Sequence, residues 1–86
     1  MILDYVTKYY LPLMEIDETI PPVKSLLLDI SNNDCKGVES SYEELIDFIR
    51  LQIDPSKYEK INLYFRRMKQ HLEDTFKINL QYAYFI

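Results

Sequence analysis

Apolar residues recur at spacings of three and four through residues 55–77, which is the repeat of one face of an α-helix. They are Tyr58, Ile61, Phe65, Met68, Leu72 and Phe76. Ser56 with Glu59 three residues later fits a capping box at the start of this segment. Asp54, followed by a proline at the first helical position, is the competing cap. The pattern predicts a long amphipathic helix from about residue 55 to about residue 77.

A second helix is predicted over residues 41–53. Ser41 and Glu44 repeat the capping-box pattern, and the apolar residues behind them share one face. Those residues are Tyr42, Leu45, Ile46, Ile49 and Ile53. The helix should end at Asp54, because the residue before a proline avoids the helical conformation. So short a connection predicts that this helix and the next fold back or cross as a hairpin.

A third helix is predicted to begin at the two prolines 21–22, with Thr19 or Ile20 before it, because proline is favoured in the first turn. Its buried residues should be Val23, Leu26, Leu27 and Ile30. Residues 31–37 read as a polar loop that contains the only glycine of the chain, Gly37. Glycine is the natural turn residue, so we expect the turn there.

The first segment fits two structures. The apolar residues Ile2, Val6, Tyr9, Tyr10 and Leu13 fit a helix, whereas Leu3, Tyr5, Tyr9 and Leu11 fit a strand with one apolar step missing at Thr7. The helix is the favoured interpretation. Pro12 should then kink or end it, because proline lacks an N–H and crowds the preceding turn.

Residues 78–86 show the two-residue repeat of a half-buried strand, with apolar residues at Ile78, Leu80, Tyr82, Tyr84 and Ile86. A segment this apolar should dock on its own core or on a partner. The complete pattern predicts an all-α protein, a compact bundle of about four helices with an extended or strand-like C-terminal tail. A length of 86 residues predicts one domain, 1–86, because no second core could be built.

The cysteine count and the distribution of apolar residues indicate the cellular compartment of the protein. Cys35 is the only cysteine, so an intramolecular disulfide and a thiolate metal cluster are both excluded. Asp4 and Lys8 interrupt the apolar residues at the start, unlike a signal peptide. No window approaches the ~18 apolar residues of a membrane span. We therefore expect a cytoplasmic protein that does not enter a membrane.

Catalysis is not expected. The only histidine, His71, lies among cations on the predicted 55–77 helix, where it reads as a surface residue. One histidine and one cysteine far apart in sequence do not make a metal site, and one glycine cannot make a phosphate-binding loop. The sequence therefore predicts no catalytic residues, no metal and no cofactor.

Charge differs between the two parts of the chain. The net charge is −4. Residues 1–54 hold four Lys and Arg against eleven Asp and Glu, a balance of −7, whereas residues 55–86 have a balance of +3. In a stacked bundle, the acidic residues near 15–18 and 29–47 are expected to share one end or face. The candidate partner-binding carboxylates are Asp17, Glu18, Asp29, Asp34, Glu39, Glu43, Glu44 and Asp47.

A nucleic-acid contact is the alternative. Arg66, Arg67 and Lys69 on the basic face of the 55–77 helix could act as a helix-turn-helix-like recognition surface. The acidic balance of residues 1–54 opposes this, because that part of the chain would repel DNA. Nucleic acid is therefore the less favoured partner.

In size, acidity and helical make-up, the chain is similar to the small immunity proteins that neutralise bacterial toxins, although the resemblance covers no motif. The leading hypothesis is an acidic, protein-binding inhibitor of this immunity or antitoxin type. Its carboxylate-rich face would bind a basic protein such as a nuclease toxin, where phosphates would otherwise bind. The other alternative is a structural or adaptor subunit that forms a homo-oligomer through the C-terminal tail.

Overall fold

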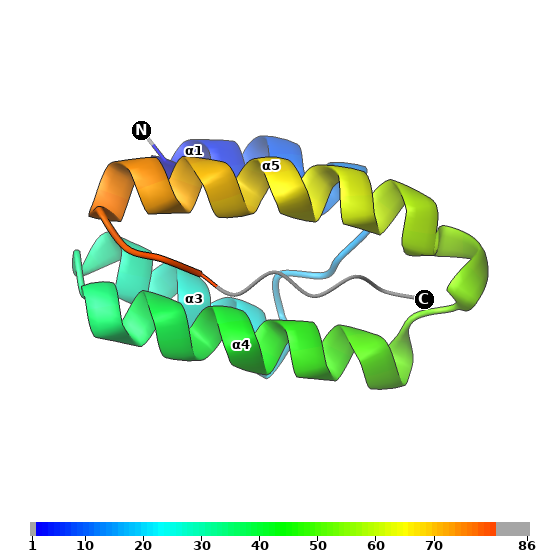
Figure 1. Cartoon of the computed structure of the whole chain (residues 1–86). Helices are drawn as coiled ribbons and strands as arrows, with labels where there is room; N and C mark the ends of the chain where they lie inside the picture. The colour runs from blue at the N-terminus through cyan, green and yellow to red at the C-terminus, as the bar shows by residue number, and fades with distance from the viewer. Residues whose placement is uncertain (1, 81–86) are drawn as a thin grey trace.

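The computed structural model of the protein describes residues 2–80, and Met1 and residues 81–86 lie outside this range (Figure 1). Within the described range, 80% of the residues are helical and none lies in a strand. The predicted all-α fold class is therefore confirmed. No helix within residues 2–80 combines the length and apolarity that crossing a lipid bilayer requires.

The helical segments form two layers. In chain order they are α1 (Ile2–Tyr5), the π-helical turn η1 (Val6–Tyr10), α2 (Leu11–Leu13), α3 (Pro21–Ser31), α4 (Cys35–Gln52), the 3-10 turn η2 (Pro55–Lys57) and α5 (Tyr58–Phe76). Figure 1 shows α1 beside α5 in one layer and α3 beside α4 in the other. Among the helices, α3 and α4 share the most extensive contact. The helices α4 and α5 run in opposite directions, as the short connection between them predicts.

The N-terminal segment is helical from residue 2 to residue 13, as the favoured interpretation predicted, but it contains one wide π turn. At the end of that turn, the Leu11 N–H donates to the Val6 carbonyl, five residues back. In a regular α-helix the Lys8 carbonyl would accept from the N–H of residue 12, which proline lacks. The π turn removes this requirement, because it pairs a carbonyl with the N–H five residues ahead. The helix then ends at Leu13, directly after the proline.

The predicted apolar stripes form the core. The buried residues of α3, α4 and α5 include Val23, Leu26, Ile30, Tyr42, Leu45, Ile46, Ile49, Ile61, Phe65, Met68, Leu72 and Phe76. Leu27, Ile53 and Tyr58 are half-buried at the edges of this cluster. The rings of Tyr42 and Phe65 meet edge to face between α4 and α5, with their centroids 5.7 Å apart. The 3.6-residue repeat therefore identified the buried face of each of these helices.

The start of α4 differs from the prediction. The helix begins at Cys35, and the Asp34 carboxylate caps it by accepting a hydrogen bond from the Gly37 N–H (3.0 Å). Ser41 therefore lies inside the helix, so the capping box proposed for residues 41–44 is wrong. The turn before α4 is made by Asn33, at a φ of 57°, and not by glycine. Asparagine tolerates this left-handed conformation because its short polar side chain can bond locally.

Gly37 has a packing role inside α4. A Cβ atom at this position would lie 2.6 Å from the Asp34 Oδ2 atom and 2.7 Å from the Asp29 Cγ atom. The Asp29 carboxylate also accepts a hydrogen bond from the buried Ser41 hydroxyl (2.5 Å). A side chain at this position would therefore displace the Asp29 and Asp34 carboxylates.

The start of the last helical segment follows the second of the two predicted caps. Asp54 is the cap residue, and its carboxylate accepts a hydrogen bond from the Ser56 N–H (3.0 Å). The chain then makes the turn η2, which places Pro55 where no N–H is needed, before α5 begins at Tyr58. The Asp54–Pro55 start therefore prevails over the Ser56–Glu59 box.

After α5, the chain reverses direction at Lys77, which takes the left-handed conformation. Residues 78–80 have no regular secondary structure and run between α5 and α4 (Figure 1). The Leu80 side chain is buried in the core, and its N–H donates to the Glu73 Oε2 atom (2.8 Å). Most of the strand-like tail predicted over residues 78–86 lies outside the described residues.

Phe65→Ala should destabilise the protein by about 3–5 kcal/mol, because truncating a core aromatic loses its transfer free energy and leaves a cavity. Arg67→Ala, at an exposed position of the same helix, should cost less than about 0.5 kcal/mol. Urea unfolding of both variants gives the comparison. If the two variants lost the same free energy of unfolding, the assignment of the buried face of α5 would be wrong.

Gly37→Ala should destabilise the protein by about 1–3 kcal/mol, although alanine is the better helix former by about 1 kcal/mol. The new methyl group would force the Asp29 and Asp34 carboxylates out of their hydrogen bonds. Ser40→Ala, at an exposed position of α4, is the matched control and should be neutral or slightly stabilising. A Gly37→Ala variant more stable than the wild type in urea would contradict the close approach of α3 and α4.

Candidate protein-binding surfaces

Several of the predicted partner-binding carboxylates hold the fold together. Asp17 accepts hydrogen bonds from the Thr19 N–H and from the Thr19 hydroxyl, both at 2.8 Å. The backbone bond from Thr19 lowers the pKa of Asp17 below its ordinary value. Asp29 and Asp34 serve the contact between α3 and α4. These three side chains are therefore engaged within the chain.

Residues 15–18 and residues 29–34, the first part of the second acidic segment, lie at opposite ends of the molecule. Glu15 forms an ion pair with Lys57 (3.3 Å), at the end where α4 passes into α5. Residues 29–34 lie at the other end, where the Cys35 Sγ donates to the Phe76 carbonyl (3.6 Å; Figure 1). Residues 15–18 and 29–34 therefore do not share one end, whereas the rest of the second segment, residues 35–47, runs along α4 away from residues 29–34. The exposed Glu18 lies with the first segment.

Four of the predicted carboxylates stay together along α4, and we call them the acidic stripe. They are Glu39, Glu43, Glu44 and Asp47. Three of them recur every four residues, so they follow one line along the helix. Glu39 is half-buried and the other three are exposed. Within residues 2–80, none of the four forms a hydrogen bond or an ion pair.

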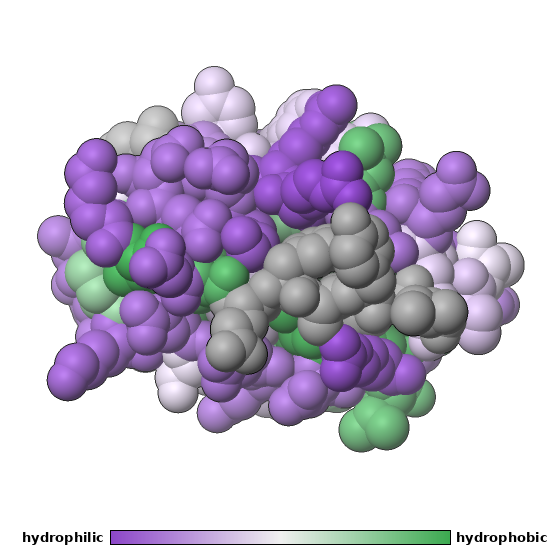
Figure 2. Space-filling view, in the orientation of Figure 1, coloured by the Kyte–Doolittle hydropathy of each residue, from purple (hydrophilic) through white to green (hydrophobic). Residues whose placement is uncertain are grey.

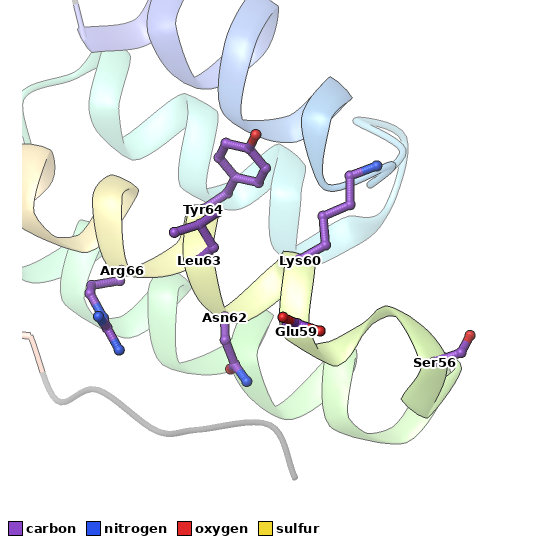
Figure 3. Close-up of a pocket in the computed structure, with 7 residues that line it drawn as sticks. All are labelled: Ser56, Glu59, Lys60, Asn62, Leu63, Tyr64 and Arg66. Carbon is purple, nitrogen blue, oxygen red and sulfur yellow. The ribbon is translucent and has the colours of Figure 1, made fainter.

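The predicted nucleic-acid residues do not form one basic face. Lys69 is half-buried and pairs with Glu73 (3.0 Å), the residue that binds the Leu80 N–H. The Arg67 guanidinium lies over the ring of Tyr64, 5.8 Å from its centroid. Figure 3 shows Arg66 pointing to the opposite side of α5 from Tyr64. Successive helix positions differ by about 100° in direction, which separates these cations.

The outer side of α5 has a shallow pocket of about 540 Å³ (Figure 3). It is lined by Ser56, Glu59, Lys60, Asn62, Leu63, Tyr64 and Arg66. In Figure 3 these side chains point in several directions and do not converge on one point.

The sequence interpretation missed a groove between the N-terminal helix and α5, which we call the tyrosine groove. It has a volume of about 600 Å³ and is lined by Tyr5, Tyr9, Tyr10, Arg67, Gln70, His71 and Asp74. Tyr5 is 52% exposed and Tyr9 is 41% exposed. The two tyrosines are four residues apart, as are Arg67 and His71. This spacing was visible in the sequence, but nothing local showed that the two helices would pair.

The rings of the tyrosine groove hold one another in place. The Tyr10 hydroxyl and the His71 Nδ1 atom form a 3.1 Å hydrogen bond. The ring of Tyr5 meets His71 edge to face at 5.0 Å, and that of Tyr9 meets Tyr64 at 6.2 Å. Burial raises the pKa of Tyr10, so its hydroxyl keeps its proton at neutral pH. His71 is therefore part of an aromatic cluster as well as a surface residue.

The face of the molecule shown in Figure 2 is mostly hydrophilic, and apart from the grey atoms its apolar side chains appear in small separate patches. In residues 2–80, no three His, Cys, Asp or Glu side chains are grouped so that they could hold a metal ion. No protein-family model, curated protein or solved structure matches the chain. The chemistry of the surface is therefore the basis for the function proposed below.

Glu73→Gln should destabilise the protein by about 1–2 kcal/mol at pH 7, because the charged acceptor of the Leu80 N–H and of Lys69 is lost. The Leu80 N–H and then Lys69 hold the pKa of Glu73 below its ordinary value. This stability is present above the unfolded-state pKa of about 4.3 and is lost as the pH falls through the lower folded-state pKa.

Urea unfolding at pH 7 and pH 3 measures this effect. The wild type should lose more stability between the two pH values than Glu73→Gln does. Glu18→Gln, at an exposed position with no described hydrogen bond, is the matched control and should follow the wild type. The same acid-induced loss in all three proteins would exclude the proposed role of Glu73.

Proposed function

We propose that the protein is a small acidic binding module of the immunity or antitoxin type. It neutralises a basic protein, such as a nuclease toxin, by presenting the acidic stripe of α4. It acts by contact and not by catalysis, as a compact bundle of about four helices. The cytoplasm is the proposed compartment, because a reducing environment suits the single free Cys35.

The observation behind this proposal is that the acidic stripe has no role in the described structure. Asp17, Asp29 and Asp34 bond to neighbouring groups, whereas the stripe has no such bonds within residues 2–80. Like charges four residues apart on a helix are destabilising by about 0.2–0.5 kcal/mol per pair. A feature that costs stability and supports nothing inside the fold is typical of a functional surface.

The stripe suits a cationic partner for two physical reasons. Its carboxylates project from one helix at intervals of about 6 Å along the axis, because four residues rise by that distance. A line of negative charge accelerates the encounter with a basic protein and fixes its orientation. In the active site of a nuclease, carboxylates would occupy the positions where the phosphates of the substrate bind.

The nucleic-acid alternative has less support. Lys57 and Lys60 lie within 4.0 Å of Glu15, and Lys69 pairs with Glu73. Three of the lysines of the basic 55–77 segment are therefore neutralised by neighbouring carboxylates. The adaptor alternative depends on the tail, most of which lies outside the described residues.

Glu43→Lys/Asp47→Lys should abolish capture of the partner. The experiment compares proteins retained from a lysate of the native host by the wild type and by this variant, using quantitative mass spectrometry. A basic protein should bind the wild type at low salt and be lost from the variant. With the captured protein purified, stopped-flow mixing at low salt should show an association rate at least about tenfold slower for the variant.

Asp4→Lys/Glu59→Lys is the matched control, because it makes the same change in net charge at exposed positions that are not among the candidate partner-binding carboxylates. It should capture the partner as the wild type does. If both double variants lost capture of the partner equally, the effect would come from net charge alone, and the proposal would be wrong. Binding that depends on Arg66 and Arg67, with retardation of DNA or RNA at physiological salt, would favour the nucleic-acid alternative.

A further inference from the structure

The chain reverses direction after α5 at a single residue, Lys77. Its backbone lies in the left-handed region, at a φ of 58°. A residue with a Cβ atom is less stable there than in a right-handed helix, because the Cβ atom approaches the following carbonyl oxygen. Residues 78–80 contain neither proline nor glycine, so their sequence does not stop α5 from continuing through the turn. The contacts that follow the turn therefore hold the reversal in place.

Those contacts belong to residues 78–80, which we call the strap. The strap runs between α5 and α4 (Figure 1), and the Leu80 side chain is only 6% exposed in the core. The Leu80 N–H donates to the Glu73 Oε2 atom (2.8 Å), and the other oxygen of this carboxylate accepts from Lys69 (3.0 Å). The strap therefore fits a socket that combines an apolar core site with an oriented carboxylate.

A second copy of the chain offers the same strap, with the same apolar side chain and the same N–H. The socket can therefore hold a strap from either copy through identical contacts. The two arrangements differ at residue 77. This residue must be left-handed for the strap to return to its own socket, whereas it can join α5 when the strap passes to another copy. A short hinge in an unfavourable conformation is the feature that favours exchange of a segment between copies.

We infer that two copies of the chain exchange their straps and form a closed dimer. Leu80 of each copy enters the core of the other copy, and its N–H donates to the Glu73 carboxylate there. Each strap is used and each socket is filled, so no further copies add. At low protein concentration the chain's own strap fills the socket, because its attachment gives it a high effective concentration. The inference does not depend on the proposed function, because no residue of the acidic stripe takes part.

Refolding of the full chain from urea at a series of protein concentrations tests the inference, because unfolding frees every strap. Size-exclusion chromatography should show a dimer whose fraction rises with concentration. Lys77→Gly should lower the dimerisation constant at least about tenfold, because glycine takes the left-handed conformation without the Cβ penalty and each dimer has two hinges. Lys77→Ala keeps the Cβ atom and favours the helix, so it should dimerise at least as well as the wild type.

Glu15→Gly and Asn33→Gly are the matched controls, because both residues have a φ of 57° in turns outside the strap and its hinge. Both should dimerise as the wild type does, and circular dichroism checks that every variant is folded. A wild type that stays monomeric at every concentration would overturn the inference. A dimer that Lys77→Gly forms to the same extent as the wild type would also overturn it, because the contact would then be an ordinary surface interface.

Glu73→Gln separates the strap contact from the hinge. It weakens the same hydrogen bond in the monomer and in the dimer, so the dimer fraction at equilibrium should stay within about twofold of the wild type. Release of the strap should become easier, so native mass spectrometry of mixed isotope-labelled dimers should show subunit exchange at least about fivefold faster. An unchanged exchange rate would mean that the strap does not join the two copies.

Discussion

The close approach of α3 and α4 at Gly37 is the contact on which the rest of the structure depends. The Asp29 carboxylate lies between the helices there: it accepts a hydrogen bond from Ser41, and a Cβ atom at Gly37 would meet it. A glycine facing a fixed carboxylate sets the rotation of α4 about its own axis. That rotation turns Tyr42 and its apolar neighbours inward, and it leaves the acidic stripe facing outward.

The charged residues consequently fall into two classes. One class is engaged in the fold: Asp54 caps the turn before α5, and Lys69 with Glu73 holds residue 80 against the core. The other class includes the acidic stripe and Arg67, which have no ionic partner within residues 2–80. Net charge alone cannot separate these classes, because a carboxylate that caps a helix counts the same as one that faces solvent.

The two candidate binding surfaces arise from different kinds of packing. The acidic stripe belongs to a single helix, so its spacing follows directly from the helical repeat. The tyrosine groove needs two segments far apart in the chain, because Tyr10 of the N-terminal helix bonds to His71 of α5. A surface made by one helix can be proposed from its residues, whereas a groove between helices exists only after they pair.

The sequence by itself determined the helices and their buried faces, because the 3.6-residue repeat is a local property. It also contained the α4 carboxylates, with the correct spacing. Tertiary structure decided where α4 begins: Ser41 fits a capping box locally, but Asp29 of the neighbouring helix takes its hydroxyl and Asp34 caps the helix instead. It likewise decided which charges are engaged and where the tyrosines gather. These outcomes depend on residues distant in the chain, whose hydrogen bonds and ion pairs form only when the helices pack.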